Sequence, residues 1–148
     1  MMETAYAHGI NFFDNAEAYG GGGVSERVMG DAIQLGLERG TWERDDLVIS
    51  TKIFFGGRGR KDTVNSKGLS RKHLFEGLKN SLARMRLDYV DLVFCHRPDP
   101  KTPIIETVKG MNHLINQGTD SLRSPLPAKL LTATGCCCCC DAKISSPE

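Results

Sequence analysis

Four side chains that can hold or transfer a proton stand at or just beyond the ends of apolar segments. They are Asp14, Tyr19, Lys52 and His96. A tyrosine phenol has a reference pKa of about 10 and is a poor acid at neutral pH, but a nearby ammonium group favours its phenolate form. Asp14 would keep Lys52 charged and oriented, and an imidazole can hold a carbonyl oxygen in position. The set suits proton donation to a carbonyl oxygen while hydride arrives at the carbon.

Each of these side chains also has a purely structural interpretation, and a short match is weak evidence alone. An aspartate can begin a turn, a lysine can be a solvated strand terminus, a tyrosine can cover apolar surface, and a histidine can bond to backbone. What favours a shared site is their equivalent placement after consecutive strands, because reacting groups gather at the carboxyl ends of strands in parallel α/β folds.

Apolar runs alternate with amphipathic segments along the chain. The runs predict strands at residues 10–13, 46–52 and 89–96. The order α-β-α-β-α-β-α fits βα units with right-handed crossovers and predicts an α/β fold with a parallel sheet. The expected helices cover residues 2–8, 25–39, 70 to about 85, and 102 to about 118.

Local signals predict how these elements begin, end and pack. Ser25 and Ser70 are expected to cap helices, Thr102 to cap a helix with Pro103 in its first turn, and Gly9 to end a helix in a left-handed conformation. The first strand lacks alternation, which predicts burial on both faces. The expected buried helix faces are Val28, Met29, Ala32, Ile33 and Leu37; Leu74, Leu78, Leu82 and Met85; and Ile104, Val108, Met111 and Ile115.

The composition of the 148 residues is that of an ordinary globular protein, with 40% apolar and 25% charged residues. A net charge of +1 gives no global attraction to nucleic acid or an acidic membrane. No run approaches the roughly 20 apolar residues of a membrane span, and the start of the chain lacks the features of a signal peptide. Because Cys95 is the only cysteine outside a later run, a reducing, cytoplasmic location is expected.

Three further features carry weaker signals. Gly20 to Gly23 precede a helix but lack the Gly-Lys-Ser/Thr ending of a phosphate-binding loop. The basic loop at residues 56–68 has no interleaved aromatics, so a solvated rim is favoured over nucleic-acid binding. Residues 119–148 are expected to be a disordered, low-complexity tail foreign to the rest of the chain. Within that tail Cys136 to Cys140 could hold a soft metal or a lipid, but their spacing favours translated repeat sequence and no metal site is expected.

Several motifs resemble one known family. Phe13 to Gly20, followed by Ser25-Glu26 at the start of a helix, resembles the aldo-keto reductase superfamily. Four further segments look more narrowly like the branch that contains the β subunits of voltage-gated potassium channels. They are residues 51–57, 68–73, 87–93 and 97–100. The resemblance runs from about residue 2 to residue 118.

The resemblance implies a (β/α)8 barrel that uses NADPH to reduce small aldehydes and ketones. By motif match, Tyr19 would be the general acid, Lys52 and Asp14 its activating partners, and His96 the group that orients the carbonyl. Asp14 would also belong to the cofactor site. The channel-associated branch often has asparagine at the position of His96, so histidine is more similar to the general reductase pattern.

The resemblance accounts for part of a barrel only. We expect residues 1–118 to form a partial reductase domain with about three of the eight βα units. The later strands, which carry most NADPH contacts in this family, are not recognisable. The chain alone is therefore expected neither to bind NADPH tightly nor to turn over. Two alternatives remain open: an auxiliary module that docks on a potassium channel or forms a homo-oligomer, and a non-functional product of a degraded gene.

Overall fold

The computed structural model describes residues 1–57 and 64–120, with side chains as far as residue 116. Three parallel strands form one sheet in the order β1-β2-β3. The strands are β1 (Phe12–Asp14), β2 (Val48–Ile53) and β3 (Leu92–Cys95). The predicted parallel α/β sheet is therefore confirmed. The tail that was expected at residues 119–148 lies outside the described residues from 121 onward.

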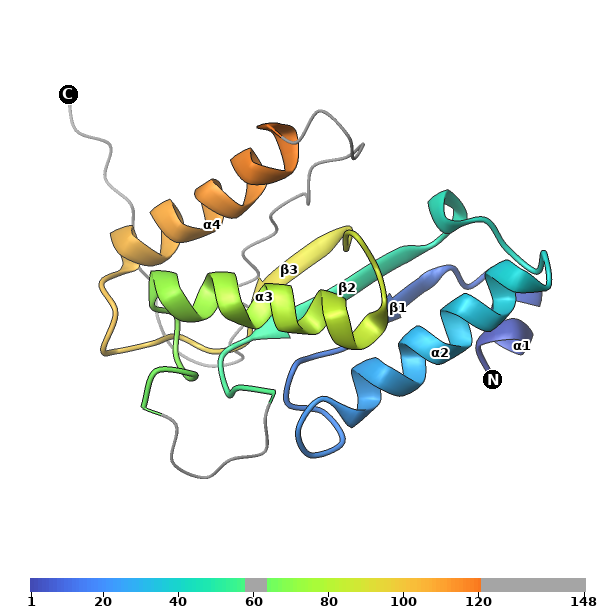
Figure 1. The fold of residues 1–148 in the computed structure, drawn as a ribbon, viewed down its shortest axis with the longest axis horizontal. Coiled ribbons are helices and arrows are strands. Elements are labelled where there is room, and N and C mark those ends of the chain that lie inside the picture. Colours follow the sequence, from blue (N-terminus) through green and yellow to red (C-terminus); the bar gives the residue numbers. More distant parts are fainter. Residues whose placement is uncertain (58–63, 121–148) are drawn as a thin grey trace.

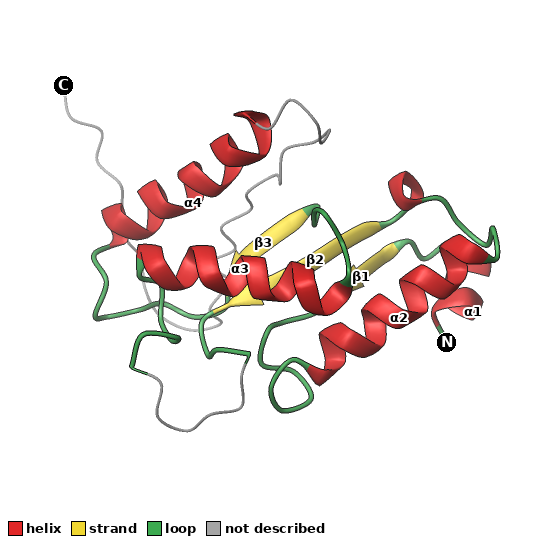
Figure 2. Ribbon diagram, in the orientation of Figure 1, coloured by secondary structure: helices red, strands yellow, loops and turns green. Residues whose placement is uncertain are grey.

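Helices alternate with the strands, as the sequence predicts. The helices are α1 (Met2–Ala7), α2 (Val24–Glu38), α3 (Arg71–Met85) and α4 (Ile104–Asp120), with a short 3-10 helix at Arg44–Asp46. Figures 1 and 2 show α2 and α3 side by side along one face of the sheet, with α4 next to α3. No helix in the described ranges has the length and apolarity needed to cross a membrane.

The hydrophobic core lies between this helical layer and the central strand β2. Ile49 and Ile53 of β2 are fully buried against Ile33 of α2 and Leu74 of α3. Each such side chain contributes roughly 1.5–3 kcal/mol when it is fully removed from water. Burial of β2 on both sides leaves its carboxyl end firmly placed, which matters because Lys52 lies there.

The strand boundaries differ from the predicted ones for reasons visible in the hydrogen bonds. The segment before β3 was predicted to pair from residue 89, but β3 begins at Leu92. The Asp91 carboxylate accepts a hydrogen bond from the backbone N–H of Ile49 at 2.8 Å and pairs with Arg44 at 2.9 Å. The Asp91 side chain thus accepts the hydrogen bond that a backbone carbonyl would accept if the strand pairing extended this far. Asp46 belongs to the 3-10 helix, so β2 also begins later than predicted.

The prediction that the first strand is buried on both faces is wrong. Phe12 is 46% exposed and Ile10 is 52% exposed, while Phe13 packs on the core. Side chains alternate along a strand, so Phe13 points toward the helices while Phe12 and Asp14 share the opposite face. The described residues leave that face of β1 open.

Helix capping follows the sequence at one of the three predicted N-terminal caps and at the C-terminal end of α1, where Gly9 is left-handed with φ +85° as predicted. The Ser70 hydroxyl accepts a hydrogen bond from the His73 N–H at 3.3 Å, which confirms the cap of α3. Ser25 does not cap α2, because Gly23 adopts a left-handed conformation (φ +77°) and the helix begins at Val24. Thr102 does not cap α4 either, since its hydroxyl donates to Asp99 at 2.8 Å and the helix begins at Ile104.

The buried faces of α2 and α4 also differ from the expected apolar stripes. Val28 is 62% exposed, and Ile104 and Val108 are 72% and 38% exposed. On both helices the packed face contains glycine, which permits closer approach than an aliphatic side chain. The buried residues are Glu26, Met29, Gly30, Ile33 and Gly36 on α2, and Thr107, Gly110 and Met111 on α4. The predicted α3 stripe is confirmed, with Leu74 and Met85 fully buried and Leu78 and Leu82 packed against the core.

At Gly30 the α2 backbone lies close to the α3 backbone, and we expect Gly30→Ala to destabilise the chain. A Cβ there would lie 2.6 Å from the Cα and carbonyl carbon of Met85. Alanine gains about 1 kcal/mol of helix propensity, but forcing backbone apart in a packed core costs more, for a net loss of about 1–3 kcal/mol. Urea unfolding followed by the fluorescence of the buried Trp42 measures it.

The matched control is Val28→Ala in the same helix, which should change the unfolding free energy by less than about 0.5 kcal/mol. If Gly30→Ala were as stable as Val28→Ala, the close approach of the two helices would be contradicted.

Candidate active site

Lys52 and Asp14 meet at the carboxyl ends of neighbouring strands. The Lys52 ammonium donates to the Asp14 carboxylate and to the Asn15 carbonyl, the latter at 2.8 Å. The Ser50 hydroxyl donates to the other Asp14 oxygen at 2.5 Å. The parallel register pairs Asp14 with Ser50 across the two strands, which sets this geometry. Lys52 is therefore held in place by an ion pair and a backbone carbonyl.

Tyr19 lies between Lys52 and His96. The Lys52 Nζ is 4.9 Å from the centre of the Tyr19 ring, within the range of a cation–π contact. The imidazole of His96 meets the same ring edge-to-face with centroids 5.6 Å apart. Tyr19 is 40% exposed, so its ring also faces solvent. The structure thus brings all four predicted residues together, while their catalytic roles remain predictions.

His96 follows β3 by one residue and is held by its backbone N–H, which donates to the Ile53 carbonyl at 3.1 Å. Its ring also contacts Phe55 edge-to-face at 5.2 Å. Burial lowers the pKa of His96, and the positive charges of Lys52 and Arg97 lower it further. The imidazole is consequently neutral at pH 7. Its Nδ1 is buried without a hydrogen-bond partner among the described residues, so a polar group is available at this edge.

Glu17 is a buried residue of the site region that sequence reasoning missed. Its side chain is 1% exposed, and Oε1 accepts backbone hydrogen bonds from Phe54 at 2.6 Å and Gly56 at 2.8 Å. His73 Nε2 lies 3.1 Å from the same oxygen. Burial raises the pKa of Glu17, but the hydrogen bonds from His73, Gly56 and Phe54 together lower it below its usual value. No periodicity marks Glu17, because it lies in a loop.

A second buried carboxylate, Glu26, ties the helical layer to β2. Glu26 is fully buried and accepts from Thr51 Oγ1 and from Arg84 Nε, both at 2.6 Å. The sequence placed Glu26 only within a family motif and gave no sign of its partners.

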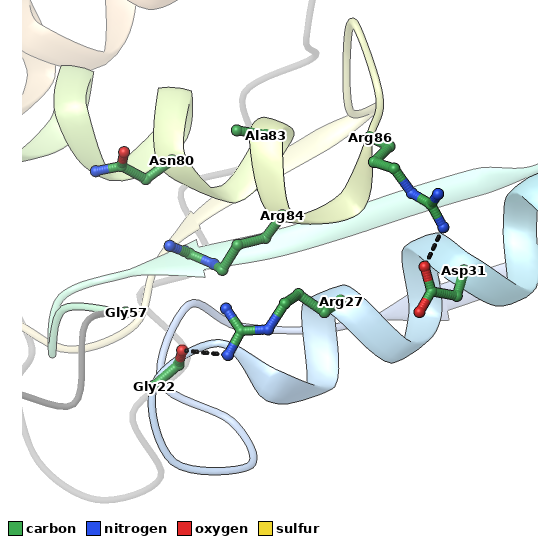
Figure 3. A pocket seen from close by; sticks show the side chains of 8 residues that line it. All are labelled: Gly22, Arg27, Asp31, Gly57, Asn80, Ala83, Arg84 and Arg86. Atoms are coloured by element: carbon green, nitrogen blue, oxygen red, sulfur yellow. Dashed lines mark hydrogen bonds and ion pairs between the residues drawn. The ribbon is translucent and has the colours of Figure 1, made fainter.

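One groove lies away from the four residues, between α2 and α3. It has a volume of about 740 Å³ and contains three arginines. Arg84 is paired with Glu26, Arg86 is paired with Asp31, and Arg27 donates to the Gly22 carbonyl at 3.3 Å. Figure 3 draws the last two of these contacts. Because all three guanidinium groups are already engaged, this groove is a weak candidate for a ligand site. In the described ranges, no three His, Cys, Asp or Glu side chains gather closely enough to hold a metal ion.

A parallel α/β sheet with acid and base groups at successive strand ends is the arrangement of α/β-barrel enzymes. The model of the aldo/keto reductase family matches residues 1–119, and the chain belongs to this family. Solved structures agree with this assignment. A thermostable aldo-keto reductase bound to the inhibitor epalrestat superposes with a TM-score of 0.62 at 34% identity, covering 79% of this chain and 36% of the other. An aldo-keto reductase complexed with NADPH superposes with a TM-score of 0.64 at 26% identity, covering 79% and 34%.

Two similar plant proteins point to one branch of the family. A probable voltage-gated potassium channel subunit beta of Arabidopsis thaliana is 58% identical over 118 residues, and one of Oryza sativa subsp. japonica is 54% identical over 119. Each match covers 80% of this chain and 33% of the relative. The chain therefore spans about a third of the length of these relatives, and the expected resemblance to the channel β-subunit branch is confirmed. Within the described residues, the sheet contributes three of the eight strands expected for the barrel, as predicted.

The lowered pKa of Glu17 leads to a prediction about stability and pH. A carboxyl group whose pKa is lower in the folded state stabilises the fold above its unfolded pKa of about 4.3, and that contribution disappears as pH falls through the folded pKa. Glu17→Gln should therefore be less stable than the wild type by about 1–3 kcal/mol at pH 7. The difference should shrink as the pH falls below about 4.3.

Urea unfolding at a series of pH values measures this difference, with Glu3→Gln as the control because Glu3 forms an exposed ion pair with Arg39. A Glu17→Gln difference that stays constant from pH 7 to acid would contradict a lowered pKa.

Proposed function

We propose that this chain carries the proton-donating half of an NADPH-dependent reductase for small aldehydes or ketones. The observation that carries the proposal is the placement of Tyr19 between the charged Lys52 and the neutral His96, in a chain of the aldo/keto reductase family. NADPH would supply the hydride that adds to the carbonyl carbon, and the Tyr19 hydroxyl would give its proton to the carbonyl oxygen. The product is an alcohol.

The neighbouring side chains support these roles. The Lys52 ammonium favours the phenolate that remains after Tyr19 gives up its proton, and Asp14 holds Lys52 in position. The neutral imidazole of His96 can hydrogen-bond the carbonyl oxygen and orient it. We assign Asp14 to the edge of the cofactor site as well. The exposed faces of Tyr19 and Asp14 fit the reacting end of the cofactor, whereas the arginines of the large groove are already engaged.

We further propose that residues 1–118 are the reductase-like part and that this chain alone neither binds NADPH tightly nor turns over. The support is that the chain spans a third of its relatives and has three strands in its described part. Titrating the purified chain with NADPH and recording cofactor fluorescence tests this. Submicromolar binding would overturn it.

The role of Tyr19 can be tested in a full-length context. In a chimera, residues 1–118 replace the matching stretch of the 58% identical Arabidopsis relative, and carbonyl-dependent NADPH oxidation is measured. Tyr19→Phe should lower kcat by about 10²–10⁴, the usual contribution of a general acid. Tyr89→Phe is the matched control, since Tyr89 stacks under Arg44 away from the site. Equal activity of the two variants would contradict the assignment.

A second candidate function is that of an auxiliary subunit of a potassium channel. The names of the rice and Arabidopsis relatives support it, and an auxiliary role is compatible with the same fold. Co-purification of the chimera with a plant potassium channel would favour this function, and its absence beside robust carbonyl reduction would favour the first. We propose a cytoplasmic location for either function, because Cys95 is a free thiol.

A further inference from the structure

One carboxylate oxygen connects three segments around the candidate site. Glu17 Oε1 takes hydrogen bonds from the backbone N–H groups of Phe54 and Gly56 and lies 3.1 Å from His73 Nε2. Glu17 stands two residues before Tyr19, and Phe54 stands two residues after Lys52. The contacts therefore join the loop that carries the phenol to the segment that follows the lysine and to α3.

The backbone around Glu17 adds to this connection. The Glu17 N–H donates to the Lys52 carbonyl at 3.2 Å, and the Tyr19 N–H donates to the Ala16 carbonyl at 3.1 Å. Ala16 is fully buried. The turn that presents the Tyr19 ring is thus closed by its own hydrogen bond from Tyr19 to Ala16 and is attached to β2 at Lys52.

The carboxylate is also enclosed by α3. A Cβ at Gly77 would lie 3.2 Å from Glu17 Oε2, so the helix approaches the carboxylate closely at a residue without a side chain. Glu17 and His73 have side chains that are 1% and 3% exposed and line a cavity of about 280 Å³. α3 thus limits the movement of the carboxylate on one side, and the three contacts at Oε1 hold it there, while Oε2 has no hydrogen-bond partner among the described residues.

We propose that Glu17, with His73, is a positioning residue that holds the Tyr19 ring against Lys52 and His96. A negatively charged oxygen accepts several hydrogen bonds more strongly than a neutral one, which explains why a buried carboxylate serves here. What Tyr19 does chemically rests on the proposed function. The placement of its ring does not, and can be measured separately.

The competing explanation is that Glu17 stabilises the fold and nothing more. Glu26 supplies a matched control, because it is also a fully buried carboxylate that joins a strand to α3, with its hydrogen bonds to Thr51 and Arg84. A general loss of buried charge would affect both variants alike. A positioning role makes only Glu17 affect Tyr19.

The experiment records the ring protons of the four histidines of the full chain by NMR. The His96 resonance is assigned with His96→Gln, and the ring-current contribution of Tyr19 is measured with Tyr19→Leu. Glu17→Ala should move the His96 resonance at least halfway to its Tyr19→Leu position, and the matched variant Glu26→Ala should leave it near the wild-type value. A wild-type His96 resonance in Glu17→Ala, or equal shifts in both glutamate variants, overturns the proposal.

If Trp42 fluorescence shows that Glu17→Ala does not fold, His73→Gln decides instead, since it weakens one of the three contacts and keeps the carboxylate. It should move the His96 resonance in the same direction as Tyr19→Leu, and no movement overturns the proposal. In the chimera, Glu17→Ala should lower kcat by about 10–100-fold, because a misplaced catalytic group loses rate steeply. An inactive parent chimera would count against the proposed function, whereas the NMR result stands independently.

Discussion

The pairing of β2 with both of its neighbours is the constraint on which the candidate site depends. Parallel register aligns Asp14 with Ser50 and Lys52 with Phe94, so the carboxyl ends of three strands meet at one edge. The ion pair between Lys52 and Asp14 follows directly from this alignment. A slip of one residue in β2 would turn Lys52 to the opposite face and bury it in the core. The burial of Ile49 and Ile53 opposes such a slip.

Two buried carboxylates then attach the helical layer to that sheet. Burying a charge costs several kcal/mol unless hydrogen bonds and an opposite charge offset the loss of water. Glu26 has Arg84 and Thr51 as partners, and Glu17 has two backbone N–H groups and His73. The two carboxylates are held by different chemistry: Glu26 by a full ion pair, and Glu17 mainly by backbone donors to Oε1, while its buried Oε2 has no hydrogen-bond partner among the described residues. The backbone partners of Glu17 are Phe54 and Gly56, which directly follow β2 and Lys52. The position of the Glu17 carboxylate therefore depends on the path of the chain after β2.

The sequence predicted the sheet and the four polar residues because both depend on local patterns. The polar residues stand at the end of a strand or a few residues after it, so they can be located from the strand pattern alone. The Ser70 cap likewise depends only on the three residues that follow it. The failures depend on distant contacts. The exposure of Phe12 depends on what covers a whole sheet face, and the start of β3 depends on the Asp91 carboxylate taking the Ile49 N–H from 42 residues away. The partners of Glu17 come from residues 54, 56 and 73, so no periodic pattern marks them.

The exposed apolar residues bear on how the site would function. Phe12 lies on the same sheet face as Asp14, and Ile104 and Val108 lie on a helix whose other side packs on α3. In a closed barrel, strand side chains on the inner face fill the interior, and helices pack against their neighbours around the ring. The same closure would remove water from the face that carries Asp14 and strengthen the attraction between Lys52 and its partners, since charges interact more strongly in a lower dielectric. Phe12 is 46% exposed and the Asp14 side chain 39% exposed on this same face of β1. Three strands bring the four residues together, and in the role that we propose for Tyr19 the closure of a barrel would strengthen its interaction with the Lys52 ammonium.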